Sequence, residues 1–378
     1  MQIAAQGWLV FSLTNSAFYL GVVTAAGSMP ILFFTLFGGV LADRFRKRSL
    51  LMFTQTVSIL PAAILGILTF TQQVQIWQVI ALVGLLGVVN SLDIPVRQSF
   101  LIDLVAPESL HHAIALNAAA FNGARMIGPA LAGFLISWFG LYICFWLNAV
   151  SFGASLLALY FIRSADADQY PKEEGGVFAR MKEGFVYLKM DKEIFSLMVL
   201  VSVLSLFGLP YATLLPVFAR EILLVDSEGY GLLMSSVGLG ALSGALWLAF
   251  RVSGGGDSRR NVYLGGVFFA AAMISFSQSR HITLSILLLF CTGFAAVAVI
   301  ASINTTIQKK IPNHLRGRVM SIYTTLFLGM FPIGSLIMGA SSHLIGVRYA
   351  VAISGVICLT VVVVGSWRCY RKAKQTNG

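Results

Sequence analysis

Long apolar runs repeat along almost the whole chain, and they constrain its fold more than any other feature. Each is about 20 residues long, enough to cross the hydrocarbon core of a bilayer. The predicted helices cover residues 18–42, 49–70, 76–99, 110–137, 140–162, 194–219, 229–250, 261–279, 282–307, 317–343 and 348–368. Only 11% of the 378 residues are charged, whereas soluble domains carry about a quarter. The sequence therefore predicts an all-α membrane protein.

The apolar opening, residues 1–14, is shorter than the other runs. At about 1.5 Å per residue it covers about 21 Å of a core that is about 30 Å thick. No Lys or Arg precedes Arg44, so the opening lacks the charged start of a secretory signal. We interpret Met1 as an internal methionine in a first helix that is truncated at its N-terminus, which makes twelve transmembrane helices. The alternative is a truly shortened helix in a damaged protein.

The basic residues are distributed very unevenly between the two sets of loops. With twelve helices and both termini on one side, 22 of the 26 Lys and Arg residues fall in one set of loops. The other set holds only Arg220, Arg280 and Arg348, and Arg125 lies within a helix. By the positive-inside rule the basic set, with both termini, is cytoplasmic. The net charge of +11 therefore faces the lipid bilayer and indicates no nucleic-acid partner.

One long polar stretch, residues 163–193, interrupts the apolar pattern. It predicts a cytoplasmic linker whose later part, residues 178–185, is an amphipathic helix on the membrane surface. The linker separates an N-terminal six-helix bundle, residues 1–162, from a C-terminal six-helix bundle, residues 194–378. The segments 107–110 and 312–315 begin corresponding helices with similar residues, which is typical of two parallel repeats.

The loop after the second apolar run carries a specific motif, because residues 38–48 read GGVLADRFRKR. This pattern resembles the G-x-x-x-D-R-x-x-R-R loop of the major facilitator superfamily of secondary transporters. The resemblance implies a conformational latch of Gly39, Asp43, Arg44 and Arg48, in which the acid caps a helix of the other half in the outward-open state. A carboxylate is favoured at a helix N-terminus, and residues 313–318 are the expected partner. The alternative is a loop that only sets the topology.

Three charges lie within predicted helices, where an unpaired charge is costly. Asp93 and Arg97 are four residues apart and share a helix face. They either brace the inner ends of helices 18–42, 76–99 and 317–343 together with Asp43, or Asp93 takes up and releases a proton, or both. Arg125, near the middle of helix 110–137, attracts an anionic substrate, tunes a nearby acid or pairs within the core.

The residues after Arg125 include Gly128, Pro129 and Gly133, which partly match the G-P-x-x-G-G element of antiporters in the superfamily. With the opening MQIAAQGWLV and the segment DIPVRQ at 93–98, they place the resemblance in the enterobactin-exporter and macrolide-efflux branch. The resemblance implies a major facilitator fold, a monomer in the inner membrane of a bacterium, and proton-coupled export of an amphipathic small-molecule substrate. An importer or facilitator on the same fold, or a degenerate protein that transports nothing, are the alternatives.

Few other residues carry chemistry. The chain has no P-loop, and its four cysteines and five histidines lack metal-ligand spacing, so we expect no enzyme activity, cofactor or metal. Polar side chains within helices are the candidates for substrate contact, although neighbouring helices satisfy most such groups. These candidates are Asn117, Asn122, Tyr211, Asn304 and Tyr323.

Overall fold

The computed structural model describes residues 1–162, 191–253 and 258–376, and every regular element within them is a helix. The helices are α1 (Gln2–Thr14), α2 (Ala17–Arg44), α3 (Lys47–Phe70), α4 (Ile76–Asp103), η1 (Pro107–Ser109), α5 (Leu110–Phe139), α6 (Tyr142–Phe161), α8 (Lys192–Val203), η2 (Leu204–Gly208), η3 (Leu209–Leu214), α9 (Leu215–Val217), η4 (Phe218–Ile222), α10 (Ser227–Ser253), α11 (Ser258–Gln278), α12 (Ile282–Lys310), α13 (Asn313–Ile345) and α14 (Val347–Thr376). The amphipathic helix predicted at 178–185 lies outside the described residues.

Eleven spans in the described part of the chain are long and apolar enough to cross a membrane, as the apolar runs predicted. Several of these helices extend farther than predicted. For example, α4 continues to Asp103, α12 continues to Lys310, and α13 already begins at Asn313. Hydropathy marks only the hydrocarbon core, whereas a helix can continue with polar residues through the headgroup layer. The predicted bounds were therefore too short where charged residues follow the apolar run.

The span from Lys192 to Ile222 differs from the plain helix that the sequence suggested. It passes from α8 into the π-helical segment η2, the 3-10 segment η3, the short α9 and a second π-helical segment, η4. Pro210 and Pro216 lie in η3 and α9 and have no backbone N–H to donate. Because two donors are missing, the hydrogen-bond ladder shifts register here. Tyr211, a predicted substrate contact, sits in this irregular stretch.

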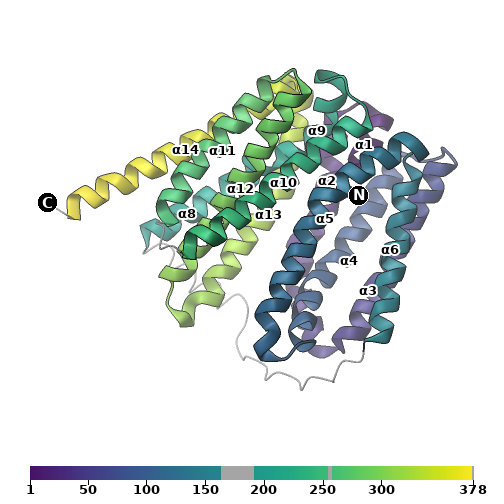
Figure 1. Ribbon diagram of the computed structural model, residues 1–378, viewed down its shortest axis with the longest axis horizontal. Coiled ribbons are helices and arrows are strands. Elements are labelled where there is room, and N and C mark those ends of the chain that lie inside the picture. The colour runs from purple at the N-terminus through teal and green to yellow at the C-terminus, as the bar shows by residue number, and fades with distance from the viewer. Residues whose placement is uncertain (163–190, 254–257, 377–378) are drawn as a thin grey trace.

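The helices form two groups that follow the order of the chain. In Figure 1 residues 1–162 lie on the right and residues 191–376 on the left, and the groups approach near the top and diverge toward the bottom. We call the end where α2 meets α3 and α12 meets α13 the basic end. It carries Lys47, Arg48, Lys309, Lys310 and Arg316. The other end of the bundle is the opposite end.

Backbone-close contacts join α5 to α10 across the two groups. A Cβ atom placed on Gly133 would lie only 2.5 Å from the Ser227 carbonyl oxygen, and one on Gly231 only 2.6 Å from the Pro129 carbonyl oxygen. The Ser227 hydroxyl also donates a hydrogen bond of 3.1 Å to the Gly133 carbonyl. Small residues allow such close approach, which is how helices associate in lipid. The two groups are therefore sealed together at the opposite end.

A second contact of the same kind joins α2 to α13. A Cβ atom on Gly21 would lie 2.5 Å from the Ser335 carbonyl oxygen, and Gly339 packs against Ala17. The contact continues to Leu32 and Gly329, near the middle of both helices. On α5 the close contacts likewise reach the middle, where the Arg125 carbonyl meets Gly238. Toward the basic end, α5 is exposed at residue 112 and from 114 to 121. The groups therefore touch from the opposite end to mid-depth.

Ion pairs fix the helix ends within each group at the basic end. Lys47 Nζ lies 2.6 Å from Asp103 Oδ2 and joins the start of α3 to the end of α4. Lys310 Nζ lies 2.9 Å from Asp191 Oδ2 and 2.7 Å from Glu193 Oε2, which joins the end of α12 to the start of α8. These pairs hold neighbouring helices of one group together and leave the two groups free to move relative to each other.

Asp191 also caps α8, because its Oδ1 accepts hydrogen bonds from the backbone N–H groups of Glu193 and Ile194. Partial burial alone would raise the pKa of Asp191, but Lys310 and these N–H groups outweigh it and hold the pKa below its ordinary value of 3.8. A lowered carboxyl pKa stabilises the folded state above the ordinary pKa and loses this effect as the pH falls through the folded pKa.

We expect Lys310→Met to lower the melting temperature near pH 7 by a few degrees at most, because partly exposed ion pairs contribute at most about 1 kcal/mol. The deficit should shrink as the pH falls below 3.8, where the wild type also loses the pair. Thermal unfolding of the purified protein from pH 3 to pH 7 measures this. Lys309→Met, one residue earlier on the exposed surface, is the control; an equal deficit there would contradict the pairing.

We expect Gly133→Leu to prevent closure of the opposite end, because its side chain would collide with the backbone of α10. Gly123→Leu is the matched control on the same helix, since a Cβ at Gly123 meets nothing within 4 Å. Spin labels at Trp138 and Leu232, both exposed, report the α5–α10 separation in a cysteine-free background. The distance should increase in Gly133→Leu only, and unchanged distances in both variants would contradict the seal.

Candidate functional site

A buried carboxylate, Asp93, is the centre of a polar network between α3 and α4. Its side chain is 9% exposed. Oδ1 accepts hydrogen bonds from the Thr54 hydroxyl at 2.7 Å and from Gln55 Nε2 at 2.8 Å. Oδ2 accepts from Arg97 Nε at 3.0 Å and from Arg97 Nη2 at 2.7 Å. Four donor contacts stabilise the charged carboxylate in an apolar surrounding.

Arg97 differs from Asp93 in its contact with solvent. Its side chain is 54% exposed, so the ion pair joins a buried acid to a cation that faces outward. The sequence suggested a brace to helices 18–42 and 317–343 together with Asp43, whose side chain lies outside the described residues; the described partners of Asp93 are Thr54 and Gln55 of α3 and Arg97 of α4 itself. Thr54 and Gln55 lie about two helix turns from the basic end of α3, and their polarity within an apolar run was the signal that the sequence analysis missed.

The predicted latch residues lie at the junction of α2 and α3. Gly39, Asp43 and Arg44 fall in the last turns of α2, and their side chains lie outside the described residues. Arg48 is described, and it donates hydrogen bonds from Nε to the Leu159 carbonyl at 2.8 Å and from Nη2 to the Tyr160 carbonyl at 2.6 Å. Arg48 thus caps the end of α6 within its own group, because a cation is favoured at a helix C-terminus.

The glycine-proline element of α5 forms part of the contact between the two groups. The Pro129 carbonyl and Gly133 lie against Gly231 of α10, and Gly128 is buried. The helix continues through Pro129. The element is therefore structural in this conformation, since it provides the flat surface that α10 approaches.

Arg125 lies where the close contact between α5 and α10 ends. Its carbonyl faces Gly238 of α10, and its guanidinium carbon lies 5.9 Å from the ring centroid of Phe121, one turn closer to the basic end. Tyr211, from the other half of the chain, is buried, with its ring 6.4 Å from that of Phe276.

The other polar candidates are arranged differently. Asn304 of α12 is hydrogen-bonded to the Tyr323 hydroxyl of α13, and that hydroxyl also lies 3.5 Å from the Ile300 carbonyl. Asn122 donates a hydrogen bond of 2.8 Å within its own helix, to the Ala118 carbonyl. Asn117 is exposed on the part of α5 that lies toward the basic end. The pair Asn304–Tyr323 is therefore a contact within the second group.

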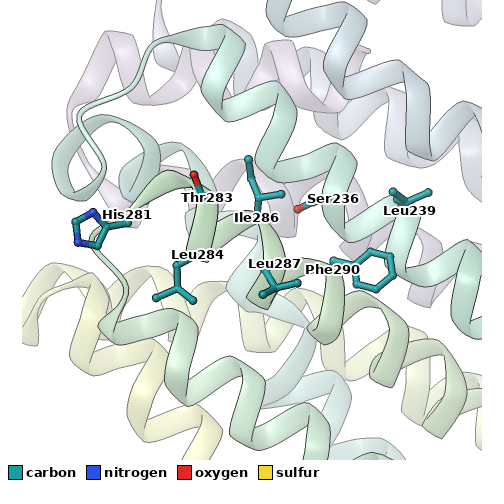
Figure 2. A pocket seen from close by; sticks show the side chains of 8 residues that line it. All are labelled: Ser236, Leu239, His281, Thr283, Leu284, Ile286, Leu287 and Phe290. Atoms are coloured by element: carbon teal, nitrogen blue, oxygen red, sulfur yellow. The ribbon is translucent and has the colours of Figure 1, made fainter.

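An apolar groove lies away from the predicted site residues. It is a shallow groove of about 650 Å³ between α10 and α12 near the opposite end, with His281 at one end and Phe290 at the other, and none of the predicted site residues lines it. Figure 2 shows Leu239, Leu284 and Leu287 along the groove, and all three are exposed. An apolar groove with exposed leucines suits lipid chains, so it is separate from the site around Arg125.

In the described residues no cluster of His, Cys, Asp or Glu is suited to a metal ion.

We expect Thr54→Val to destabilise the protein by about 1.5–3 kcal/mol, because it removes a hydrogen bond to a buried charged group. Thr56→Val is the matched control, since exposed Thr56 bonds only to the Met52 carbonyl of its own helix, and such surface changes stay within about 0.5 kcal/mol. Thermal unfolding in detergent compares them. Equal shifts in melting temperature would show that the Asp93 network contributes little.

Known proteins of similar sequence share almost the whole length of this chain. The staphyloferrin A transporter of Staphylococcus aureus is 27% identical over 361 residues, covering 94% of this chain and 89% of the relative. The multidrug efflux pump Tap of Mycolicibacterium fortuitum is 25% identical over 355 residues, with 92% and 86% covered. Macrolide efflux protein A of Streptococcus pyogenes is 20% identical over 355 residues, with 92% and 87% covered.

Solved structures share the fold at much lower identity. The nucleoside transporter NupG aligns with a TM-score of 0.73 at 12% identity, covering 96% of this chain and 93% of that one. A D-xylose-proton symporter aligns with a TM-score of 0.70 at 12% identity, covering 96% of each. The predicted major facilitator fold is thereby confirmed. A family model described as transmembrane secretion effector matches residues 1–377. The chain therefore belongs to the transmembrane secretion effector family, within the major facilitator superfamily of membrane transporters.

Proposed function

We propose that this transporter exports an amphipathic small molecule in exchange for protons, as a monomer with two alternating bundles, residues 1–162 and 194–378, joined by a linker at 163–193. The observation that most supports this proposal is that the close contacts between the two groups of helices run from the opposite end only to the level of Arg125. With the basic end in the cytoplasm, as the positive-inside rule indicates, the cavity below Arg125 opens inward. An exporter collects its cargo in this state.

Relatives support the direction of transport. Two of the three described above are named for efflux, one of multiple drugs and one of macrolides, and the third is named for transport of staphyloferrin A. The glycine-proline element Gly128, Pro129 and Gly133 adds to this, because it resembles an element of antiporters. Export of an amphipathic compound is therefore a better proposal than import.

Asp93 is the proposed proton carrier. Among the described residues it is the only buried carboxylate, and its exposed partner Arg97 faces the water-accessible side. A proton taken up by Asp93 would cancel its attraction to Arg97 and weaken the brace between α3 and α4. Proton binding would in this way favour one conformation over the other, which is the differential affinity that coupling requires.

The junction of α2 and α3 is the proposed latch of the alternate state. When the opposite end opens, the basic end has to close, and Asp43 would then cap the start of α13 near residues 313–318. Gly39 and Arg44 would shape this turn. Arg48 stays on the end of α6 in this proposal, so it anchors the latch to the first bundle.

Dye retention in energised cells tests the proposal. Cells that express the protein should retain less of an amphipathic fluorescent dye than cells with an empty vector, and an uncoupler should abolish the difference. Asp93→Asn should lose at least about tenfold in efflux rate, which is about 1.4 kcal/mol, while insertion into the membrane stays normal. Thr56→Val is the control for expression.

Two results would contradict the proposal. Greater accumulation in expressing cells would indicate an importer, and efflux that the uncoupler leaves unchanged would exclude proton coupling. Wild-type efflux by Asp43→Asn would remove the latch from the mechanism but leave the export proposal standing.

A further inference from the structure

The position of Arg125 is the feature that most constrains the chemical class of the transported substrate. Arg125 lies near the middle of the 30-residue helix α5, so its depth is close to the bilayer midplane. Its backbone touches α10 through Gly238, and its side chain extends toward Phe121 and the basic end. A side chain that leans toward the start of its helix is the normal direction. The cation therefore sits where the close contact between the two groups ends, and it extends toward the basic end.

Arg125 has no carboxylate partner within the described part of the chain. The ion pairs there join Lys47 to Asp103, Arg97 to Asp93, and Lys310 to Asp191 and Glu193. Its described side-chain contact is the face of Phe121. A cation at membrane depth that has no counter-ion among the described residues has to face water or a charged ligand.

The surroundings of Arg125 suit a ligand that is part anion and part apolar. Phe121 is 63% exposed and presents an aromatic surface beside the cation, and the exposed stretch from residue 114 to 121 continues that surface. The planar guanidinium group of an arginine donates two parallel hydrogen bonds to a carboxylate, because the geometries of the two groups match.

We propose that the cavity selects amphipathic carboxylates, with the carboxylate bound by Arg125 and the apolar body packed along Phe121. This inference rests on the proposed function only in taking the cavity as the path of the cargo. An amphipathic cation of the same size meets the like charge of Arg125 and is disfavoured.

Equilibrium binding to the purified protein tests the selectivity without any proton gradient. The probes are 2-naphthylacetate and the 2-naphthylethylammonium ion, which share the apolar ring and differ in the sign of the charge. Binding is followed by microscale thermophoresis or by the rise in melting temperature with millimolar probe. The anionic probe should bind at least about tenfold more tightly than the cationic probe, which is about 1.4 kcal/mol.

Variants assign the effect to Arg125. Arg125→Gln should lose the preference for the anion, and Arg125→Lys should keep most of it because the charge remains. Lys309→Gln is the control for general positive potential, since Lys309 is an exposed cation at the basic end on α12. It should leave the preference unchanged.

The inference is overturned if the cationic probe binds as tightly as the anion or if neither probe binds at millimolar concentration. It is also overturned if Lys309→Gln reduces the preference as much as Arg125→Gln does. Because these measurements involve no transport, they separate the two proposals. Anion binding without uncoupler-sensitive efflux would contradict only the proton-coupled export, and efflux without anion preference would contradict only the assignment of Arg125.

Discussion

The absence of water from the bilayer core is the constraint on which the rest of this structure depends. Without water, every backbone N–H and C=O in the core has to bond within the chain, so each crossing is helical. Lipid tails are as apolar as leucine, so burial gives little reason for the helices to associate. What holds the two groups together is therefore close backbone packing, at Gly133 against Gly231 and at Gly21 against Gly339.

The same constraint explains why polar groups in the helices are arranged in two opposite ways. Asp93 is surrounded by donors from Thr54, Gln55 and Arg97, so its charge is compensated inside the protein. Among the described side chains, the contact of the Arg125 guanidinium is the aromatic face of Phe121. A compensated charge serves stability and switching, whereas an uncompensated charge is suited to binding what the protein lacks.

Most of the fold could be predicted from sequence, because hydropathy reports directly on the length of each crossing. The eleven spans were predicted correctly, while their ends at Asp103, Lys310 and Asn313 were missed because hydropathy does not register a helix in the headgroup layer. The pairing of Asp93 with Arg97 followed from their spacing. The contribution of Thr54 and Gln55 did not, because it depends on how α3 lies against α4.

A seal made of main-chain atoms at Gly133 and Gly231 is indifferent to the chemistry of what passes. Its fit depends on the absence of side chains, so residues that line the path can change without disturbing it. The glycine contact that closes the opposite end and the residues that select the substrate can therefore change independently in evolution. A few substitutions near Arg125 and Phe121 can change which substrate is transported, while the closing contact stays the same.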